Sequence, residues 1–171
     1  MHKHENNYAF IDLQNLHLGT KSAGWIVDFQ KLFIYLRERH SVTKAYLFLG
    51  YLRSNSKLYK RLRSIGFTLI FKETVKLPNG GIKGNCDVDL TLHALITINE
   101  FYKCVLITGD GDFYTLIQYM VLKDKFLKLL IPNKSSYSIL YKRNVLKPYI
   151  TYLSDLRSKI EKKRPHEDGT S

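Results

Sequence analysis

Short apolar runs alternate along the chain with segments whose apolar residues recur at helical spacing. The apolar runs have the length of strands and lack clear polar alternation, which is typical of strands covered on both faces. They comprise Tyr8 to Leu13, Ala45 to Leu49, Phe67 to Phe71, Cys104 to Ile107 and Phe126 to Ile131. The helix-like segments comprise Phe29 to Arg39, Lys57 to Ser64, Val88 to Phe101 and Phe113 to Leu122. This order predicts an α/β fold whose central sheet is mainly parallel and joined by right-handed crossovers.

Glycine and proline mark the ends of these elements. Gly50, Gly66 and Gly109 lie beside apolar runs, and Pro132 follows the last run at a position that a central strand does not tolerate. The glycine-rich stretch Leu77 to Asn85 predicts a long loop. With 171 residues, the chain suits one compact domain.

Aspartates stand where two of the predicted strands end. Asp12 lies at the end of the first apolar run, and Asp110 and Asp112 follow the fourth. Open parallel sheets bind ligands beyond the carboxyl ends of their strands, so we expect these acids at one edge of the sheet. A carboxylate buried there needs a hydrogen-bond partner or a cation.

The start of the longest helical pattern carries two more acids. Asp87 and Asp89 stand two positions apart, so on a helix their side chains diverge by about 200°. At most one of them is expected to face the site directly, unless the other caps the helix. Aspartates that converge repel one another, and this predicts a hard cation such as Mg²⁺ or Mn²⁺. Such an ion activates water and neutralises phosphate charge, which indicates phosphodiester hydrolysis.

Each acid also has a structural interpretation. Asp112 before Phe113 is a good helix N-cap, and Asp110-Gly111 is an ordinary turn pair. Asp12 can cap the turn that follows it through Asn15. Taken singly, the turn residues are more often structural than catalytic, so the chemical interpretation depends on the three segments converging.

Three blocks together resemble the NYN domain family, and in particular the LabA-like branch of these PIN-like nucleases. They are Phe10 to Leu16, Lys83 to Leu90 and Leu106 to Phe113. The resemblance covers residues 8–131 and continues weakly through Ser135 to Leu153, where the family has a final helix and a small strand. It implies a PIN-like three-layer α/β/α sandwich, an acidic pocket for a divalent metal, and ribonuclease activity. The implied nuclease domain spans residues 1–153, and residues 154–171 form a basic helix extension and a polar tail.

The resemblance also implies roles for individual residues. Asp12 and Asp110 correspond to the principal metal-binding acids, and Asp87 to the acid at the helix start. Asp112 is a further ligand or orients water, and Asn15 is a polar companion. We expect all four aspartates to be catalytic, with Mg²⁺ or Mn²⁺ as the cofactor, and we place Asp89 in a secondary role.

His93 departs from the family pattern, because relatives often have another acid one turn into the same helix. It lies four residues after Asp89, so the two side chains can share a helix face. His93 is then an ion-pair partner at the edge of the site or a metal ligand, and a hydrogen-bonded structural histidine is the favoured alternative.

The chain is strongly basic, with 27 Lys and Arg against 15 Asp and Glu and a net charge of +12. This balance favours a polyanionic partner, either nucleic acid or an anionic membrane surface. Nucleic-acid contacts are expected from Lys83 and from a helical stripe of Lys57, Lys60 and Arg61, although a solvated face explains the stripe almost equally well. Tyr51 and Tyr59 lie in or beside this region and can stack on unpaired bases; RNA, taken to be single-stranded, is favoured over DNA by the resemblance alone.

Other features narrow the class of protein. No apolar run approaches the roughly 20 residues of a membrane span, and the start lacks the apolar stretch of a secretory signal, so a cytoplasmic protein is expected. Cys86 and Cys104 lack partners at metal-ligand spacing, which argues against a zinc site. A homo-oligomer is possible. Two alternatives to the ribonuclease remain: a non-catalytic nucleic-acid-binding or interaction module, and a haloacid-dehalogenase-type phosphatase, ranked last because Asp12-Leu13-Gln14 lacks that family's second acid.

Overall fold

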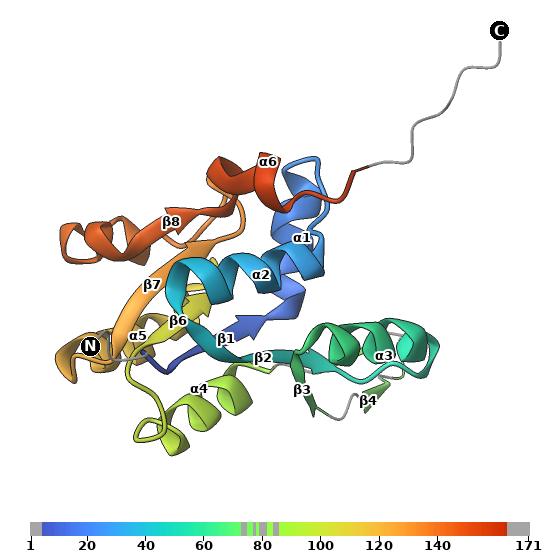
Figure 1. Cartoon of the computed structure of the whole chain (residues 1–171), viewed down its shortest axis with the longest axis horizontal. Helices are drawn as coiled ribbons and strands as arrows, with labels where there is room; N and C mark the ends of the chain where they lie inside the picture. Colours follow the sequence, from blue (N-terminus) through green and yellow to red (C-terminus); the bar gives the residue numbers. More distant parts are fainter. Residues whose placement is uncertain (1–4, 73–74, 77, 79–81, 84–85, 164–171) are drawn as a thin grey trace, which may run out of the picture.

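A central six-stranded sheet organises the molecule, with strand order β3-β2-β1-β6-β7-β8 (Figure 1). The computed structural model describes residues 5–72, 75–76, 78, 82–83 and 86–163. Every pair of neighbouring strands in this sheet is parallel. The strands are β1 (Asn7–Asp12), β2 (Val42–Gly50), β3 (Thr68–Lys72), β6 (Cys104–Ile107), β7 (Phe126–Ile131) and β8 (Ile150–Tyr152). The α/β class and the parallel sheet are therefore confirmed.

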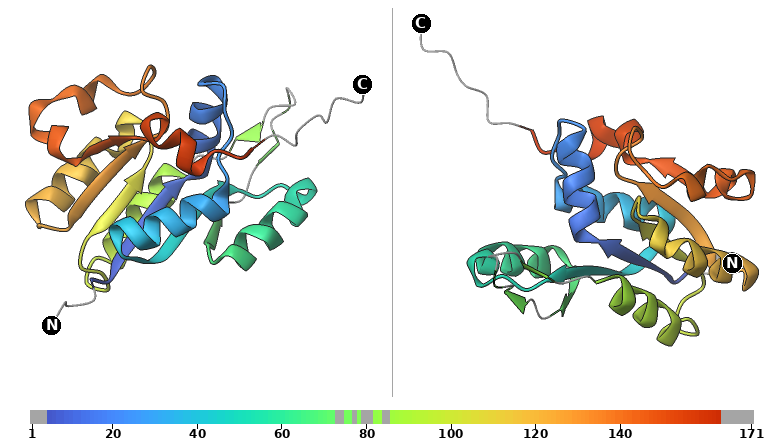
Figure 2. Two further views of the ribbon diagram at one scale, coloured as in Figure 1. Left: turned by 45° about the horizontal axis from the view of Figure 1, so that its top comes forward. Right: turned by 180° about the vertical axis from the view of Figure 1, so that it is seen from behind.

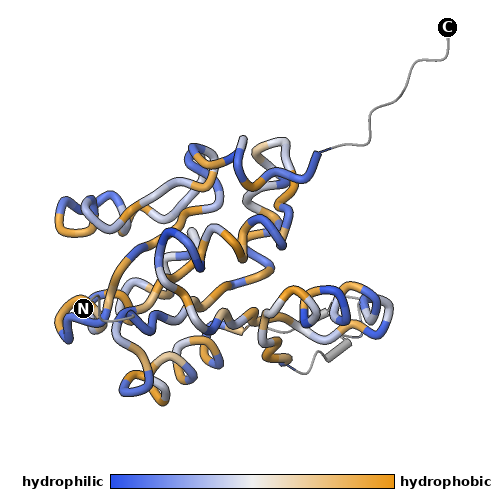
Figure 3. Tube along the Cα trace, viewed as in Figure 1, coloured by the Kyte–Doolittle hydropathy of each residue, from blue (hydrophilic) through white to orange (hydrophobic). Residues whose placement is uncertain are grey.

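Helices cover both faces of the sheet and make three layers (Figures 1 and 2). One face packs against α4 (Asp87–Ile96), α5 (Tyr114–Leu122) and the 3₁₀ segments η3 (Ile139–Lys142) and η4 (Asn144–Tyr149). The other face packs against α1 (Leu13–Ser22), α2 (Phe29–His40), α3 (Ser56–Ile65) and α6 (Arg157–Ile160). Apolar and polar residues alternate along the covering helices in Figure 3, as expected for helices with one buried side.

The pattern of β1 shows why polar alternation is missing from the strands. Tyr8 and Phe10 enter the core on the α4 and α5 side, whereas Ala9 and Ile11 enter the core on the α1 and α2 side. All four side chains are at most 2% exposed. A strand buried on both faces has no solvent-facing positions that would accept polar residues.

Two helices differ from the sequence expectation. The predicted elements did not include α1, which begins directly after β1 without a loop and contains a glycine at position 19. α4 ends at Ile96, although its predicted pattern ran on to Phe101. The next residue, Thr97, bonds the carbonyl of His93 through both its backbone N–H and its hydroxyl, the hydroxyl at 2.8 Å.

The segment after residue 153 packs into the same core. Ile160 is fully buried, and its carbonyl accepts a 2.8 Å bond from the N–H of Asp28. Glu161 forms an isolated antiparallel bridge with Val27, which ends α6 after four residues. The expected helical extension is thus short, and the boundary at residue 153 stays a prediction.

The remaining elements are small. The predicted glycine-rich loop overlaps a two-stranded antiparallel pair, β4 (Val75–Lys76) and β5 (Ile82–Lys83), and most of the loop lies outside the described residues. Short 3₁₀ turns occur as η1 (Arg53–Asn55), η2 (Gly111–Phe113) and η5 (Leu153–Leu156). Within the described part of the chain, none of the helices combines the length and apolar character needed to cross a membrane.

Candidate active site

β1 and β6 lie side by side in the sheet, and the chain leaves them toward opposite faces. After β1 it enters α1 on one face, and after β6 it passes through η2 into α5 on the other. Such a switch point opens a crevice at the carboxyl ends of the strands. Asp12 ends β1, and Asp110 follows β6, so both predicted acids stand at this crevice.

Asp12 is a buried carboxylate, with 9% of the residue exposed. Its Oδ1 accepts a 3.1 Å bond from the N–H of Asn15 and caps α1, and its Oδ2 accepts a 3.4 Å bond from the hydroxyl of Thr108. Burial raises its pKa to about 6, the hydrogen bond from Asn15 opposes this, and the charges of Asp87 and Asp110 raise it further. The pKa of Asp12 is therefore closer to neutral pH than that of an ordinary aspartate. Asp12 caps a helix, as its structural interpretation predicts, and it also lies near other acids.

Hydrogen bonds tie the turn after β6 to β1 and α1. The hydroxyl of Thr108 accepts a 3.1 Å bond from the N–H of Asp110 while it donates to Asp12. The side-chain oxygen of Asn15 accepts a 2.6 Å bond from the N–H of Gly109. Asp110 in turn accepts a 3.0 Å bond from the N–H of Asp112 through Oδ1. Thr108 and Asn15 thus hold the two acid-bearing strand ends in a fixed relation.

A second layer of contacts fixes the turn from the side of η3. The hydroxyl of Tyr141 donates to the carbonyl of Asp110, and the N–H of Ser138 donates to the carbonyl of Gly109 at 2.9 Å. Burial raises the pKa of the Tyr141 hydroxyl, and the neighbouring aspartates add to the effect, so this group remains a neutral donor. Both contacts come from the segment Ser135 to Leu153, over which the resemblance to the family is weak.

Three carboxylates converge at this edge of the sheet. One oxygen each from Asp87, Asp110 and Asp112 lies within 4.8 Å of the other two. Mg²⁺ holds oxygen ligands in an octahedron at about 2.0 to 2.1 Å, so adjacent ligands stand about 2.9 Å apart and opposite ligands about 4.1 Å apart. The donors are all hard oxygens, and the ion could be held by rotation of these side chains or by a water in place of one ligand. The residues present therefore fit a hard divalent cation.

Asp12 stands beside this group rather than in it. The three clustered carboxylates are those of Asp87, Asp110 and Asp112, while both oxygens of Asp12 already accept hydrogen bonds. Its charge still acts on the cluster, since Asp87 and Asp110 both raise its pKa. Its expected role as a principal metal ligand stays a prediction.

Asp89 and His93 point elsewhere. Asp89 forms a 3.0 Å ion pair with Lys72 at the end of β3, as expected if only one acid of the pair faces the site. The ring of His93 packs against aromatic side chains of the sheet, 4.6 Å from Tyr46 and 5.7 Å from Phe48 between centroids. Burial lowers its pKa. The structure therefore favours a packed histidine over a metal ligand.

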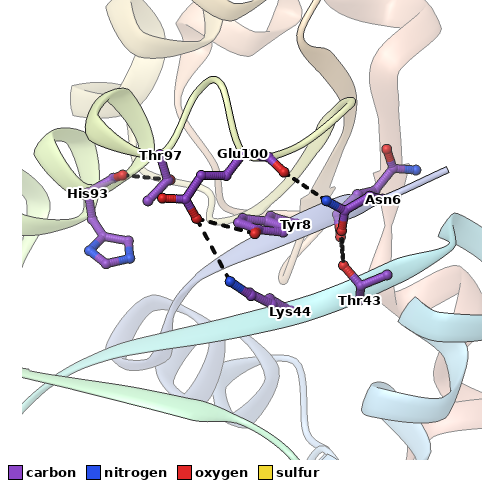
Figure 4. Close-up of polar contacts among 8 residues, drawn as sticks. Asn6, Tyr8, Thr43, Lys44, His93, Thr97 and Glu100 are labelled. Atoms are coloured by element: carbon purple, nitrogen blue, oxygen red, sulfur yellow. Dashed lines mark hydrogen bonds and ion pairs between the residues drawn. The ribbon is translucent and has the colours of Figure 1, made fainter.

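His93 lies in the C-terminal half of α4, whereas Asp87 lies at the N-terminus of this helix. Figure 4 shows its carbonyl accepting the hydroxyl of Thr97, close to the contacts of Glu100. Glu100 accepts a 3.3 Å bond from the hydroxyl of Tyr8 and lies 3.8 Å from the ammonium of Lys44. These contacts tie the segment that follows α4 to β1 and β2, and Glu100 is not one of the three clustered carboxylates.

A cleft of about 1240 Å³ opens from the acids and runs along α1. It includes Asp12, Asn15, Asp87 and Asp110, together with residues that the sequence analysis did not single out. Those on α1 and beyond β7 are Leu13, Gln14, His17, Leu18, Gly19, Ser22, Pro132, Asn133 and Ser136, and those near α3 include Phe48, Leu49, Leu52, Asn55 and Leu58. Their residue types are ordinary for helices and loops, so no sequence signal marked them.

The predicted basic residues of α3 lie outside the cleft. Lys57, Lys60 and Arg61 are exposed on α3 and do not line it, although Leu58 and Tyr59 of the same helix do. The side chain of Lys83 lies outside the described residues. Their roles in binding nucleic acid stay predictions.

Comparisons with known proteins agree with the site and the fold. The chain is 28% identical to the low amplitude and bright protein LabA of Synechococcus elongatus over 163 residues, which cover 90% of this chain and 86% of that protein. A crystal structure of a protein of unknown function from Vibrio parahaemolyticus superimposes with a TM-score of 0.73 at 19% identity, over 95% of this chain and 99% of the other. The model of the NYN domain matches residues 8–143. Because this match spans most of the chain and includes all three acidic segments, the protein belongs to the NYN domain family, as the resemblance implied.

Proposed function

We propose that the protein is a metal-dependent ribonuclease that hydrolyses RNA phosphodiester bonds at the acidic cluster. One observation carries the proposal: Asp87, Asp110 and Asp112 come from two segments distant in sequence and meet within 4.8 Å. Convergent carboxylates in a metal-free site repel one another, so an arrangement held by hydrogen bonds at the turn is useful chiefly for a cation. Membership of a PIN-like nuclease family supports the same reaction.

The cluster residues would hold Mg²⁺ or Mn²⁺, and Asp12 would supply further negative charge beside them. When bound, such an ion polarises water and neutralises charge on the phosphate. Asn15 and Thr108 keep Asp12 and Asp110 in place, so little rearrangement is needed when substrate arrives. The carboxyl of Asp12, with a pKa of about 6, can exchange a proton near neutral pH.

RNA is the substrate that the family favours, and the charge of the chain suits any polyanion. A net charge of +12 attracts a polyanion despite the local acids, and Lys57, Lys60 and Arg61 give phosphates an exposed basic surface on α3. Binding that depends on such contacts weakens steeply as the salt concentration rises. We place the reaction in the cytoplasm.

The test is cleavage of labelled single-stranded RNA and DNA with Mg²⁺ or Mn²⁺, with chelator as the negative control. We expect Asp110→Asn to lower cleavage by a factor of roughly 100 or more, because it removes a ligand charge without changing shape. Asp155→Asn is the matched control, since Asp155 is an exposed acid paired with Lys134 outside the cluster. Cleavage that survives both chelation and Asp110→Asn would rule the nuclease out.

A non-catalytic nucleic-acid-binding module is the second candidate, favoured by His93. This residue replaces an acid common in the family, and its ring packs against aromatic side chains and does not line the cleft. Salt-sensitive RNA binding without turnover, across metals and substrates, would select this alternative. Hydrolysis of p-nitrophenyl phosphate by the same preparation would instead revive the phosphatase alternative.

A further inference from the structure

The cleft changes character away from the acids, on the side that lies between α1 and α3. Three apolar side chains line it there and are also open to solvent: Leu18 is 54% exposed, Leu52 37% and Leu58 38%. We call these residues the leucine wall. Leu49 and Tyr59 also line this part of the cleft but are at most 6% exposed, so they form its base. Exposed apolar residues gathered in a concave site are typical of a ligand-binding surface.

The charges of the cleft restrict what can bind to the leucine wall. Among the described residues that line the cleft, none is lysine or arginine, the single histidine is His17, and the acids are Asp12, Asp87 and Asp110. A phosphate placed against the leucine wall would lose water without meeting a cation. The part of a nucleotide that suits this surface is the base, which is uncharged and has apolar faces.

Polar groups at the cleft suit the edges of a base. Gln14 on α1 and Asn55 at the start of α3 line the same cleft as the leucine wall. Each side-chain amide both donates and accepts hydrogen bonds, so it can pair with a base edge. The cleft volume of about 1240 Å³ exceeds the roughly 1,000 Å³ upper range of small-molecule pockets, which leaves room for a segment of polymer.

Two cationic side chains lie on α3, the helix that carries Leu58 of the leucine wall. Lys57 and Arg61 lie one position before and three positions after Leu58 on α3, and at these spacings both project to the same side of it. Both are exposed. A strand whose base enters the cleft can therefore keep its flanking phosphates at the basic rim of α3.

We propose that the leucine wall is a nucleobase subsite, which receives an unpaired base of the strand whose phosphate lies at the acidic cluster. The subsite rests on the proposed nuclease function for the position of that phosphate. A base stacked and paired within a duplex cannot enter it. The protein therefore selects single-stranded RNA by taking in a base, and not by charge alone.

The experiment measures binding, so that it does not depend on cleavage. Asp110→Asn protein is titrated, with Mg²⁺ present, into a fluorescent single-stranded RNA 12-mer and into the same chain with abasic ribose at every position. We expect the RNA with bases to bind at least about tenfold more tightly, given what a stacked base contributes. Equal affinity for the two chains, or no measurable binding of either, would overturn the subsite.

Matched variants locate the effect on the leucine wall. Leu58→Glu and Leu18→Glu, each added to Asp110→Asn, should lower the preference for bases to within about twofold. Leu122→Glu is the control, since Leu122 is 81% exposed on α5 and the substitution adds the same charge on the other face of the sheet. Taking the ratio of the two affinities cancels any general repulsion of RNA, and circular dichroism checks that each variant is folded.

The outcomes separate the subsite from the nuclease. Loss of the preference in Leu122→Glu as well as in the wall variants would overturn the subsite. Cleavage by the unmodified protein without a base preference rejects the subsite and keeps the nuclease. A base preference lost only in the wall variants supports the subsite, even if the unmodified protein shows no turnover, a result that would reject the nuclease.

Discussion

At the scale of one residue, the buried carboxylate of Asp12 lowers the stability of the fold. An aspartate ordinarily titrates near 3.8, but burial raises the pKa of this carboxyl to about 6. The folded chain therefore holds a proton at Asp12 between pH 6 and 3.8, where the unfolded chain has released it. The charged form is disfavoured in the fold, so Asp12 opposes folding most above pH 6.

Asp12→Asn should accordingly stabilise the metal-free protein. Asparagine caps helices about as well as aspartate, so the N-cap of α1 survives while the buried charge is removed. In chelator at pH 7.5 we expect a higher melting temperature, with a gain in unfolding free energy of at most about 3 kcal/mol. The difference should shrink as the pH falls from 6 toward 4, because the native aspartate then takes up its proton.

Thermal melts of both proteins at several pH values measure this difference. Asp155→Asn provides the control, because the side chain of Asp155 is exposed and the substitution removes a charge that is not buried. A lower melting temperature for Asp12→Asn at pH 7.5 would mean that the carboxylate stabilises the fold, contrary to the effect of its burial.

At the scale of elements, the site depends on how η2 and η3 pack. Asp110-Gly111 has an ordinary turn pair as its structural interpretation, but the packing around Gly111 leaves no space for a side chain. A Cβ at this position would lie 2.9 Å from the Cβ of Ser138 and would contact its hydroxyl oxygen even more closely. Ser138 is the N-cap of η3. The start of η3 therefore packs against the aspartate-bearing turn at η2.

Gly111→Ala should therefore move the aspartate turn. We expect a loss of about 1 to 3 kcal/mol in unfolding free energy, as for other overpacked sites, together with at least a tenfold loss of cleavage. Ser138→Gly removes the opposing side chain, so the double variant should recover part of both. Denaturant unfolding and the RNA assay report the two effects, and a double variant as impaired as Gly111→Ala would show that the clash is not the cause.

At the scale of the whole molecule, the end of the described chain completes the core beside α2. Ile160 is fully buried, and backbone bonds join Asp28 to Ile160 and Lys162 to Ile26 at 2.8 and 2.9 Å. The ammonium of Lys31 also bonds the carbonyl of Glu161 at 2.9 Å. The basic segment therefore has a structural role apart from any contact with nucleic acid.

Ile160→Ala tests this packing. We expect it to lower the free energy of unfolding by about 2 to 5 kcal/mol, the range for truncating a buried isoleucine. Ser158→Ala, on the exposed side of α6, should change it by less than about 0.5 kcal/mol. Equal effects in urea unfolding would mean that α6 is not part of the cooperative core.

Local pattern was sufficient for much of the fold. Five strands of the main sheet, β1, β2, β3, β6 and β7, were predicted. Apolar runs such as Cys104–Ile107 are too short for a helix and too apolar for a surface loop. α1 was missed, since it starts one residue after a strand and its buried side consists of only Leu16 and Thr20. β8 is three residues long, and only the family resemblance pointed to a strand there.

The sequence by itself determined the class of fold, the family and the edge of the sheet at which acids gather, because each follows from residues close together in the chain. Only the tertiary structure decided that Asp87 joins Asp110 while Asp89 turns to Lys72, and that Leu18 and Leu58 face one cleft. Those relations depend on the angles at which helices pack on the sheet. Such angles result from many side chains packing at once, and no local pattern encodes them.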